Sequence, residues 1–494
     1  MLDAASASGR SGSWIAGVVA LLAVVAASGF AISVADTTAL VVCASLVASV
    51  FILLDFRVGV VMLIVLMPIS TSALFPHQMA GITGLNPLNL LLFATLASYL
   101  LRASADGSLR RLVPRPLFWL YLAPFLLAGV LGSRHVGEIP PSVFLDEQIT
   151  FDNATGYLRD ILLKPALLVL FALLVAAAVK RSRQPEKFLV PAIVSIWLMG
   201  LMVVVFVAMS GTSLDFLSGA RSRPFLSQLG LHANDLGRLY AVAYALLLFT
   251  WAVTQDRALK LALAVSILLV VAALVLTFSR GAFFAFLVVN LLFLATRRRA
   301  YGFVLGALLI GALMLVLPGT LYDRVTVGFA GDLNSLSAGR VDEIWLPLVP
   351  ELWRSPLFGN GLSSILWSNA MRSGTILQVS HAHNAYLNAL LDIGVIGLAL
   401  VCTFFGLLMR DFRRLGREAR LSPTLRGFFA GGAAGLASFL VAGIAGSQLT
   451  PCAEQSFLWL AAGMLFGVRA RLAARQRTLE PRSGAVEGAA ARSA

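Results

Sequence analysis

Two histidines lie two residues apart in Ser380-His381-Ala382-His383-Asn384, in a chain that has five histidines among 494 residues. Ser380 is a suitable N-cap, so the sequence predicts that His381 and His383 lie in the first turn of a helix. The positive end of a helix dipole lowers the pKa of a histidine and favours the neutral imidazole, which a general base needs. The alternative is a histidine at a membrane boundary that only hydrogen-bonds a loop carbonyl. The polar residues Asn384 and Asn388 at the same helix start favour chemistry.

Two arginines indicate a site for an anion. Arg280 stands between two apolar runs in a hairpin with almost no loop, and a charged side chain near the bilayer interior usually marks a site. Snorkelling to the surface is the alternative. Arg340 precedes a short helix expected at 341–346, and a guanidinium can bind a phosphate through two hydrogen bonds. For Arg340 alone, a contact with a lipid headgroup explains the sequence equally well.

The residue patterns argue against a metal or an organic cofactor. Two histidines at i and i+2 without a third ligand do not form a zinc site. The acidic residues between 319 and 383 are scattered, whereas Mg²⁺ bound beside phosphates needs closely placed carboxylates. Phosphate-binding loops, dinucleotide fingerprints and serine-hydrolase elbows are missing from the sequence. We therefore predict no metal and no cofactor, with arginines neutralising the leaving group.

The elements that must position these residues are membrane spans. The chain is 59% hydrophobic and 13% charged, with a mean hydropathy of +0.87, which is far more apolar than a soluble domain. The net charge of +14 comes mostly from basic clusters between apolar runs, which indicates membrane topology rather than nucleic-acid binding. Cys43, Cys402 and Cys452 form neither a metal-binding spacing nor a disulfide framework.

We predict an all-α, polytopic inner-membrane protein with about fourteen transmembrane helices, twelve being the alternative. The basic clusters put the N-terminus in the cytoplasm and the histidines on the outer face. The expected domains are N-terminal spans in 1–318, a large external loop with short helices in 319–383, C-terminal spans in 384–470 and a disordered cytoplasmic tail in 471–494. The predicted spans are 14–34, 37–54, 58–75, 87–101, 117–132, 160–179, 188–210, 233–253, 259–278, 281–296, 302–318, 384–408, 427–446 and 455–469.

Three segments together resemble a known superfamily over about residues 220–408. They are Thr277-Phe278-Ser279-Arg280-Gly281-Ala282, then Ser337-Ala338-Gly339-Arg340 with Ser355-Pro356-Leu357-Phe358-Gly359-Asn360-Gly361, and finally His381-Ala382-His383-Asn384-Ala385-Tyr386-Leu387 with Gly394-Val395-Ile396-Gly397-Leu398. The superfamily is that of the bacterial O-antigen ligases and O-antigen polymerases. It includes exopolysaccharide polymerases and some protein O-oligosaccharyltransferases.

The resemblance implies a membrane glycosyltransferase C-type fold and a metal-independent, inverting transfer on the periplasmic face. The donor would be a glycan on undecaprenyl pyrophosphate. The acceptor would be a glycan or lipid A–core, with polysaccharide assembly proteins as further partners in the membrane and no nucleic acid. Fourteen spans, where the ligase branch has about twelve, favour polymerase slightly over ligase.

The resemblance also implies roles for individual residues. His383 would deprotonate the acceptor hydroxyl, with His381 and Asn384 in support. Arg280 and Arg340 would hold the donor pyrophosphate. The residues matched less closely, as further substrate contacts, are Arg221 and Arg223.

Two other functions remain open at this point. A flippase for lipid-linked oligosaccharides also has many spans and basic residues, although its charges should line a central cavity along many helices. Here the notable charges gather at the external ends of spans, which favours the enzyme. A scaffold protein of a polysaccharide export complex is the third interpretation.

Overall fold

The structure is a computed structural model that describes residues 47–73, 75, 78–79, 82–83, 86–105, 113–141, 143, 151–212, 222–297, 333–337, 339–376, 379–446 and 448–479. The predicted spans 14–34 and 302–318, most of 37–54, and Arg221 lie outside these residues. The chain divides into two compact units, one of residues 1–70 and 75–110, the other of residues 71–74 and 111–494.

The first unit contains two packed helices, α3 (Phe56–Leu66) and α4 (Pro87–Ala105). Asp55 caps α3 by accepting a hydrogen bond from the Arg57 amide. The 3₁₀ turn η1 (Ile69–Thr71) follows α3, and the two-residue strands β1 (Gln78–Met79) and β2 (Ile82–Thr83) pair antiparallel before α4.

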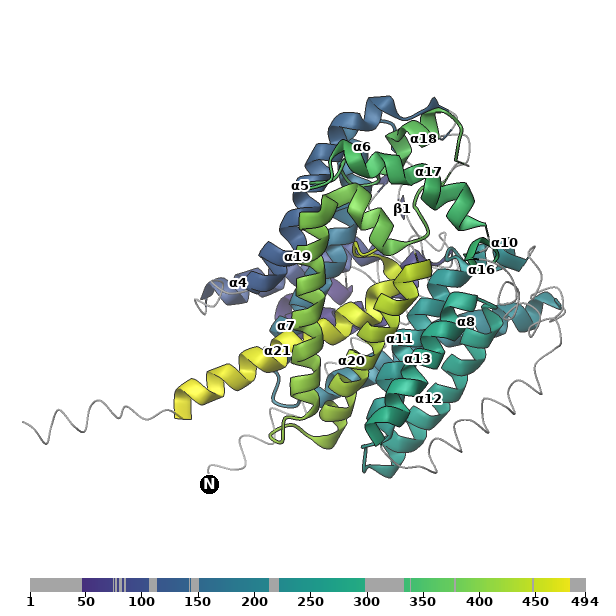
Figure 1. The fold of residues 1–494 in the computed structure, drawn as a ribbon. Helices are drawn as coiled ribbons and strands as arrows, with labels where there is room; N and C mark the ends of the chain where they lie inside the picture. Colours follow the sequence, from purple (N-terminus) through teal and green to yellow (C-terminus); the bar gives the residue numbers. More distant parts are fainter. Residues whose placement is uncertain are drawn as a thin grey trace, which may run out of the picture. The chain divides into compact units, whose positions relative to one another are not determined.

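The second unit contains the remaining helices, drawn in Figure 1. Up to the large loop they are η3 (Leu117–Leu122), α5 (Ala123–Gly132), η4 (Ser133–Glu138), α6 (Ala154–Tyr157), η6 (Leu158–Leu163), α7 (Lys164–Arg181), η7 (Pro185–Phe188), α8 (Leu189–Ser210), α10 (Ser222–Ser227), α11 (Ala233–Trp251), α12 (Arg257–Leu276) and α13 (Arg280–Arg297). The large loop carries the short helices α16 (Leu333–Ser337), η8 (Val341–Trp345), α17 (Leu346–Leu348), η9 (Val349–Arg354), η10 (Ser364–Trp367) and α18 (Asn369–Arg372). The last elements are α19 (Ala385–Gly416), α20 (Pro423–Ala442), η11 (Gly443–Ala445), η12 (Ala453–Gln455) and α21 (Ser456–Leu479).

The prediction of an all-α polytopic membrane protein is confirmed. Among the described residues, eight helices are long and apolar enough to cross a membrane, and α3 and α13 are shorter apolar helices. Every predicted span from 58–75 onward that falls among these residues coincides with a helix, although α3 ends at Leu66. The total of about fourteen stays a prediction.

One predicted boundary is wrong. The chain from residue 471 was expected to be a disordered tail, but α21 continues to Leu479. Alanine, leucine, arginine and glutamine dominate 470–479 and are all strong helix formers, so the helix extends past the apolar segment. The rest of the predicted tail, 480–494, lies outside the described residues.

Glycines let the central helices approach closely. α11 packs against α12, α13 and α20, which lie side by side in Figure 1. A Cβ atom on Gly427 or Gly431 of α20 would stand 2.6 Å from a backbone oxygen of α11. Gly463 and Gly467 of α21 approach α7 in the same way, at 2.5 and 2.6 Å. Small residues at four-residue spacing are typical of membrane helix contacts because the bilayer offers no hydrophobic driving force between spans.

The large loop is locked onto a break in α19. At Gly394 the backbone has φ of 65° and ψ of −175°, a conformation that favours glycine. The broken turn pairs instead with the loop: the Val395 amide donates to the Pro356 oxygen at 2.9 Å, and the Asn360 amide donates to the Leu391 oxygen at 2.8 Å. Two of the segments that carry the resemblance are therefore one packed unit, which fixes where the first half of α19 points.

Candidate functional site

A cavity of about 310 Å³ lies where three segments of the second unit meet. The segments are the start of α11, the loop before α19, and the chain just after α20. The lining residues are His232, Asn234, Asp235, Arg238, Val379, Ser380, His381, His383, Ala445 and Gly446. Both predicted histidines thus face a space that a small polar group can enter.

The histidines lie in a loop, not in the first helical turn as predicted. The N-cap of α19 is Asn384, whose side chain accepts hydrogen bonds from the Tyr386 and Leu387 amides at 3.0 and 3.1 Å. Asparagine caps helices as well as serine does, and His383 has a left-handed backbone with φ of 52°, which a helix cannot accommodate. Asn384 therefore has a structural role at the helix start.

Hydrogen bonds from both sides of the loop hold the backbone between the two histidines. The Trp345 indole of η8 donates to the Ala382 oxygen at 2.8 Å, and the Ala382 amide donates to Asn388 at 3.3 Å. The Asn388 side chain in turn donates to buried Asp392 at 2.8 Å, and Asp392 also accepts from Ser364. The large loop and the first half of α19 thus place the two imidazoles jointly.

The two imidazoles are packed together and are neutral. Their ring centroids are 4.2 Å apart in an edge-to-face arrangement, and the Ser380 hydroxyl lies 3.1 Å from Nδ1 of His381. Burial lowers the pKa of His381 to about 4, with a further contribution from the positive charge of Arg238. Burial lowers the pKa of His383 to about 3, reinforced by His381 and then by Arg340. The causes are desolvation and nearby charged side chains.

An ion triad around a buried arginine forms another wall of the cavity. Arg238 of α11 is 6% exposed, and its Nε donates to Glu454 of η12 at 2.6 Å. Its Nη2 also donates to Asp235 at 2.7 Å, one helical turn earlier. A guanidinium removed from water must be paired to be tolerated, and two carboxylates pair it here. The triad joins α11 to the start of the last span beside the histidines.

The hairpin that contains Arg280 is attached to the same wall. The Ser279 hydroxyl donates to Oδ1 of Asn234, a cavity residue, at 2.8 Å. Phe278 is 3% exposed and has φ of 48°, so the chain turns sharply there before α13 begins at Arg280. The structure thus brings Arg280 to within one residue of a side chain that contacts the cavity lining.

Arg340 is brought to the cavity from the large loop. Its Nη1 donates to the oxygen of Ala445, a lining residue, at 3.3 Å. It stands directly before η8, where the sequence predicted a short helix. The further candidate Arg223 lies in α10, and its side chain, like all of Arg221, is outside the described structure.

Sequence reasoning missed the triad. Arg238 and Asp235 stand three residues apart within a predicted span, and Glu454 stands directly before the span predicted at 455–469. An ionisable residue inside a membrane segment is by itself a signal of a functional or paired position, and this signal could have identified Asp235 and Arg238 but not Glu454. Within the described residues, no group of three or more His, Cys, Asp and Glu side chains is arranged to hold a metal ion.

Comparison with known families supports the resemblance. Residues 264–402 match the family model described as O-antigen ligase, which confirms the predicted resemblance to that superfamily over this segment. The matched segment contains Arg280, Arg340 and both histidines, whereas Arg238 and Glu454 lie outside it. A comparison with curated proteins gives no match.

Proposed function

We propose that this membrane protein, with its O-antigen ligase segment at 264–402, transfers a glycan from undecaprenyl pyrophosphate to an acceptor hydroxyl. The proposed site is the histidine cavity, on the periplasmic side of a bacterial inner membrane. Transfer inverts the anomeric carbon and uses no metal. Repeat-unit polymerisation is the preferred form of the reaction, ahead of ligation to lipid A–core or to a protein.

One observation carries the proposal: a neutral imidazole and two guanidinium groups meet at one cavity. His383 lines the cavity, Arg238 lines it as well, and Arg340 contacts its rim through Ala445. A glycosyl transfer from a lipid pyrophosphate needs a base for the acceptor and cations for the departing anion. The cavity supplies both kinds of group.

In the proposed step, the acceptor oxygen attacks the anomeric carbon while its proton passes to a ring nitrogen of His383. The bond from the anomeric carbon to the phosphate oxygen breaks, and the lipid pyrophosphate leaves as an anion. Arg280 and Arg340 bind the pyrophosphate, and guanidinium groups that bind more strongly as charge develops lower the barrier. His381 packs against the base and limits its rotation.

A histidine with a pKa of about 3 is a weak base, and binding of the donor would raise this pKa. Burial and the neighbouring cations Arg340 and Arg238 hold the pKa down. A bound pyrophosphate places negative charge beside these cations and favours the protonated imidazole. Base strength therefore rises when the donor is bound, which limits deprotonation of stray nucleophiles in the empty cavity.

The test is transfer by purified full-length protein in nanodiscs, given an undecaprenyl-pyrophosphate-linked glycan and no nucleotide sugar. We expect products longer than one repeat, formed equally well after treatment with a chelator. Single addition to lipid A–core without elongation would instead indicate a ligase. Movement of intact donor across a vesicle membrane without any transfer would indicate a flippase and contradict the proposal.

A further inference from the structure

A second cavity, of about 450 Å³, opens at the far end of α19 from the histidines. It is formed by the second half of α19, the last turns of α21 and the chain at the start of η3. From the break at Gly394 to Arg414 an α-helix rises about 30 Å, close to the thickness of a hydrocarbon core. The cavity therefore lies at the opposite membrane surface from the candidate active site.

The cavity wall changes character along α19. Phe404, Leu407 and Leu408 line its inner part, and Asp411, Arg414 and Glu418 line its outer part. The positions up to Arg414 follow the three- and four-residue spacing of a single helix face, and Glu418 lies in the turn after α19. On α21 Phe466 precedes Arg469, and the lining continues with Ala470, Leu472, Ala473 and Gln476. The α19 wall is thus apolar towards the bilayer interior and charged towards its surface, as a phospholipid is.

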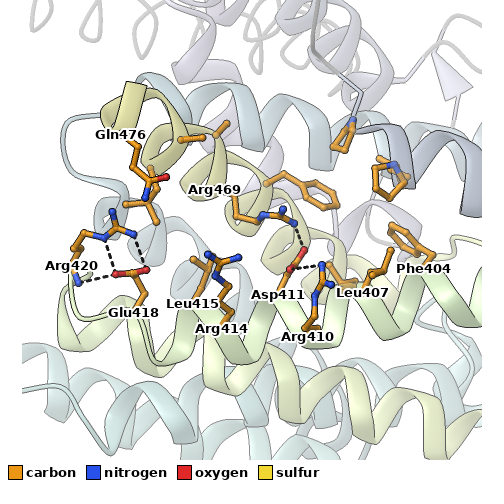
Figure 2. Close-up of a pocket in the computed structure, with 18 residues that line it drawn as sticks. Phe404, Leu407, Arg410, Asp411, Arg414, Leu415, Glu418, Arg420, Arg469 and Gln476 are labelled. Atoms are coloured by element: carbon orange, nitrogen blue, oxygen red, sulfur yellow. Dashed lines mark hydrogen bonds and ion pairs between the residues drawn. The ribbon is translucent and has the colours of Figure 1, made fainter. Parts of the chain in front are cut away.

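Positive charge is in excess at the outer part. The lining contains four arginines, Arg410, Arg414, Arg420 and Arg469, and two carboxylates, Asp411 and Glu418, which leaves two positive charges. Asp411 is buried and pairs with Arg410 and Arg469, while Glu418 pairs with Arg420 at 2.8 Å. Figure 2 shows Arg414 between these two groups, and no ion pair joins it to any residue that the structure describes.

We propose that this cavity binds one anionic phospholipid of the membrane leaflet opposite the active site. Its phosphate lies among Arg410, Arg414 and Arg469, and its acyl chain lies against Phe404, Leu407 and Phe466. Arginine forks bind phosphate oxygens in pairs, and basic pockets between spans are suited to acidic headgroups. The aliphatic stems of the exposed arginines can cover the apolar part of the headgroup region. This site is independent of the proposed transfer reaction.

Arg414→Gln is the informative variant, because Arg414 contributes unpaired charge and its loss leaves no buried carboxylate behind. Arg469→Gln is unsuitable, since it would break the pair with buried Asp411. Arg413→Gln is the matched control: it removes the same charge from the adjacent, exposed position of α19, and Arg413 does not line the cavity. Arg410→Gln provides a second test: its side chain is 68% exposed, its pair with Asp411 is long at 3.4 Å, and Arg469 still pairs with Asp411 when Arg410 is replaced.

The experiment titrates delipidated full-length protein with dioleoylphosphatidylglycerol and, separately, with dioleoylphosphatidylcholine. Bound lipid is counted by native mass spectrometry, and Tm is followed in parallel. We expect one phosphatidylglycerol to bind in preference to phosphatidylcholine and to raise Tm. Binding should weaken about fivefold in Arg414→Gln and in Arg410→Gln, and remain at the wild-type level in Arg413→Gln.

Three results would overturn the proposal. Equal weakening in Arg413→Gln would mean that only overall surface charge attracts the lipid. Equal binding of the two phospholipids would mean that the arginines do not recognise the headgroup. Equal stabilisation by inorganic phosphate or glycerol phosphate would mean that the cavity takes a free anion and that the apolar wall has no ligand.

Discussion

The two ends of α19 carry charge in opposite ways. At the start of the helix, the histidine cavity has a buried arginine matched by two carboxylates, and its imidazoles are held neutral. At its end, the second cavity has exposed arginines in excess of carboxylates. The first end holds a buried arginine in a paired geometry, whereas the second presents solvent-exposed arginines.

The contrast shows that burial determines whether an arginine must be paired. A buried arginine must be paired, so Arg238 can serve only where its partners place it. An exposed arginine is solvated by water, so leaving it unpaired costs little folding free energy. Arg414 can therefore stay unpaired and bind an anion from the membrane. The paired geometry of the histidine cavity suits the proposed transfer reaction, and the exposed arginines of the second cavity suit the proposed lipid binding.

The largest effect is expected from His383→Ala. If the cavity is catalytic, loss of the base should lower the transfer rate by about 10²–10⁴-fold while the protein still inserts and purifies normally. Rates are measured with the lipid-pyrophosphate glycan in nanodiscs. His135→Ala is the control, because His135 also packs on an aromatic side chain, Trp367, but lies outside the cavity. Near-normal transfer by His383→Ala would show that the histidine cavity is not the catalytic site.

The next effect tests the buried Arg238–Glu454 pair against an exposed pair. Glu454→Gln removes the carboxylate charge that pairs with Arg238. Breaking a buried pair costs about 3 kcal/mol or more, so Tm should fall clearly. Glu418→Gln breaks the exposed pair with Arg420 at the other end and should change Tm little. Thermal unfolding of both variants in one detergent makes the comparison. Equal falls would show that burial does not distinguish the two ends.

A smaller effect is expected from exchanging arginine for lysine at each end. Arg340→Lys keeps the charge but loses the planar fork, so the KM for the donor should rise about tenfold with little change in kcat. Arg410→Lys at the far end should leave both constants unchanged. Steady-state kinetics with varied donor separate these outcomes. A fall in kcat alone would place Arg340 in the chemical step rather than in donor binding.

The smallest effect is a dependence of stability on pH. The ordinary histidine pKa of 6.5 falls to about 4 for His381 and to about 3 for His383 in the folded protein. Below pH 6.5 the unfolded chain therefore binds more protons, so stability should fall as the pH drops from 6.5 towards 4 and should not depend on these groups above 6.5. Tm measured at about pH 7.5 and about pH 5 should differ less in His383→Gln than in the wild type.

Arg413→Gln serves as the control for the pH series, because it lies outside both cavities and should keep the wild-type difference in Tm. A difference in Tm that is the same in His383→Gln as in the wild type would mean that His383 is solvated in the folded protein. The imidazole would then lack the enclosed setting that separates the two ends of α19.

The sequence predicted the positions of the helices well and the exact residues at which they begin and end less well. Positions of spans follow from local hydropathy, so α11 and α20 were placed within a few residues. The start of α19 was misplaced because Ser380 and Asn384 are equally good caps, and only the left-handed backbone of His383 decides between them. The helical extension to Leu479 was missed because apolarity, and not helix propensity, defined the expected end of the last span.

By itself, the sequence determined that the chain is a polytopic membrane protein and which motifs it carries, and it suggested His383, Arg280 and Arg340 as candidate site residues. Composition, span length and short motifs are local properties, and these sufficed. Only the tertiary structure decided that Arg238 meets Glu454, 216 residues further along the chain, beside the histidines. It also decided that the loop at 356–361 fills the break in α19 and that arginines gather at the far end. Such contacts depend on how closely helices pack, which no short stretch of sequence specifies.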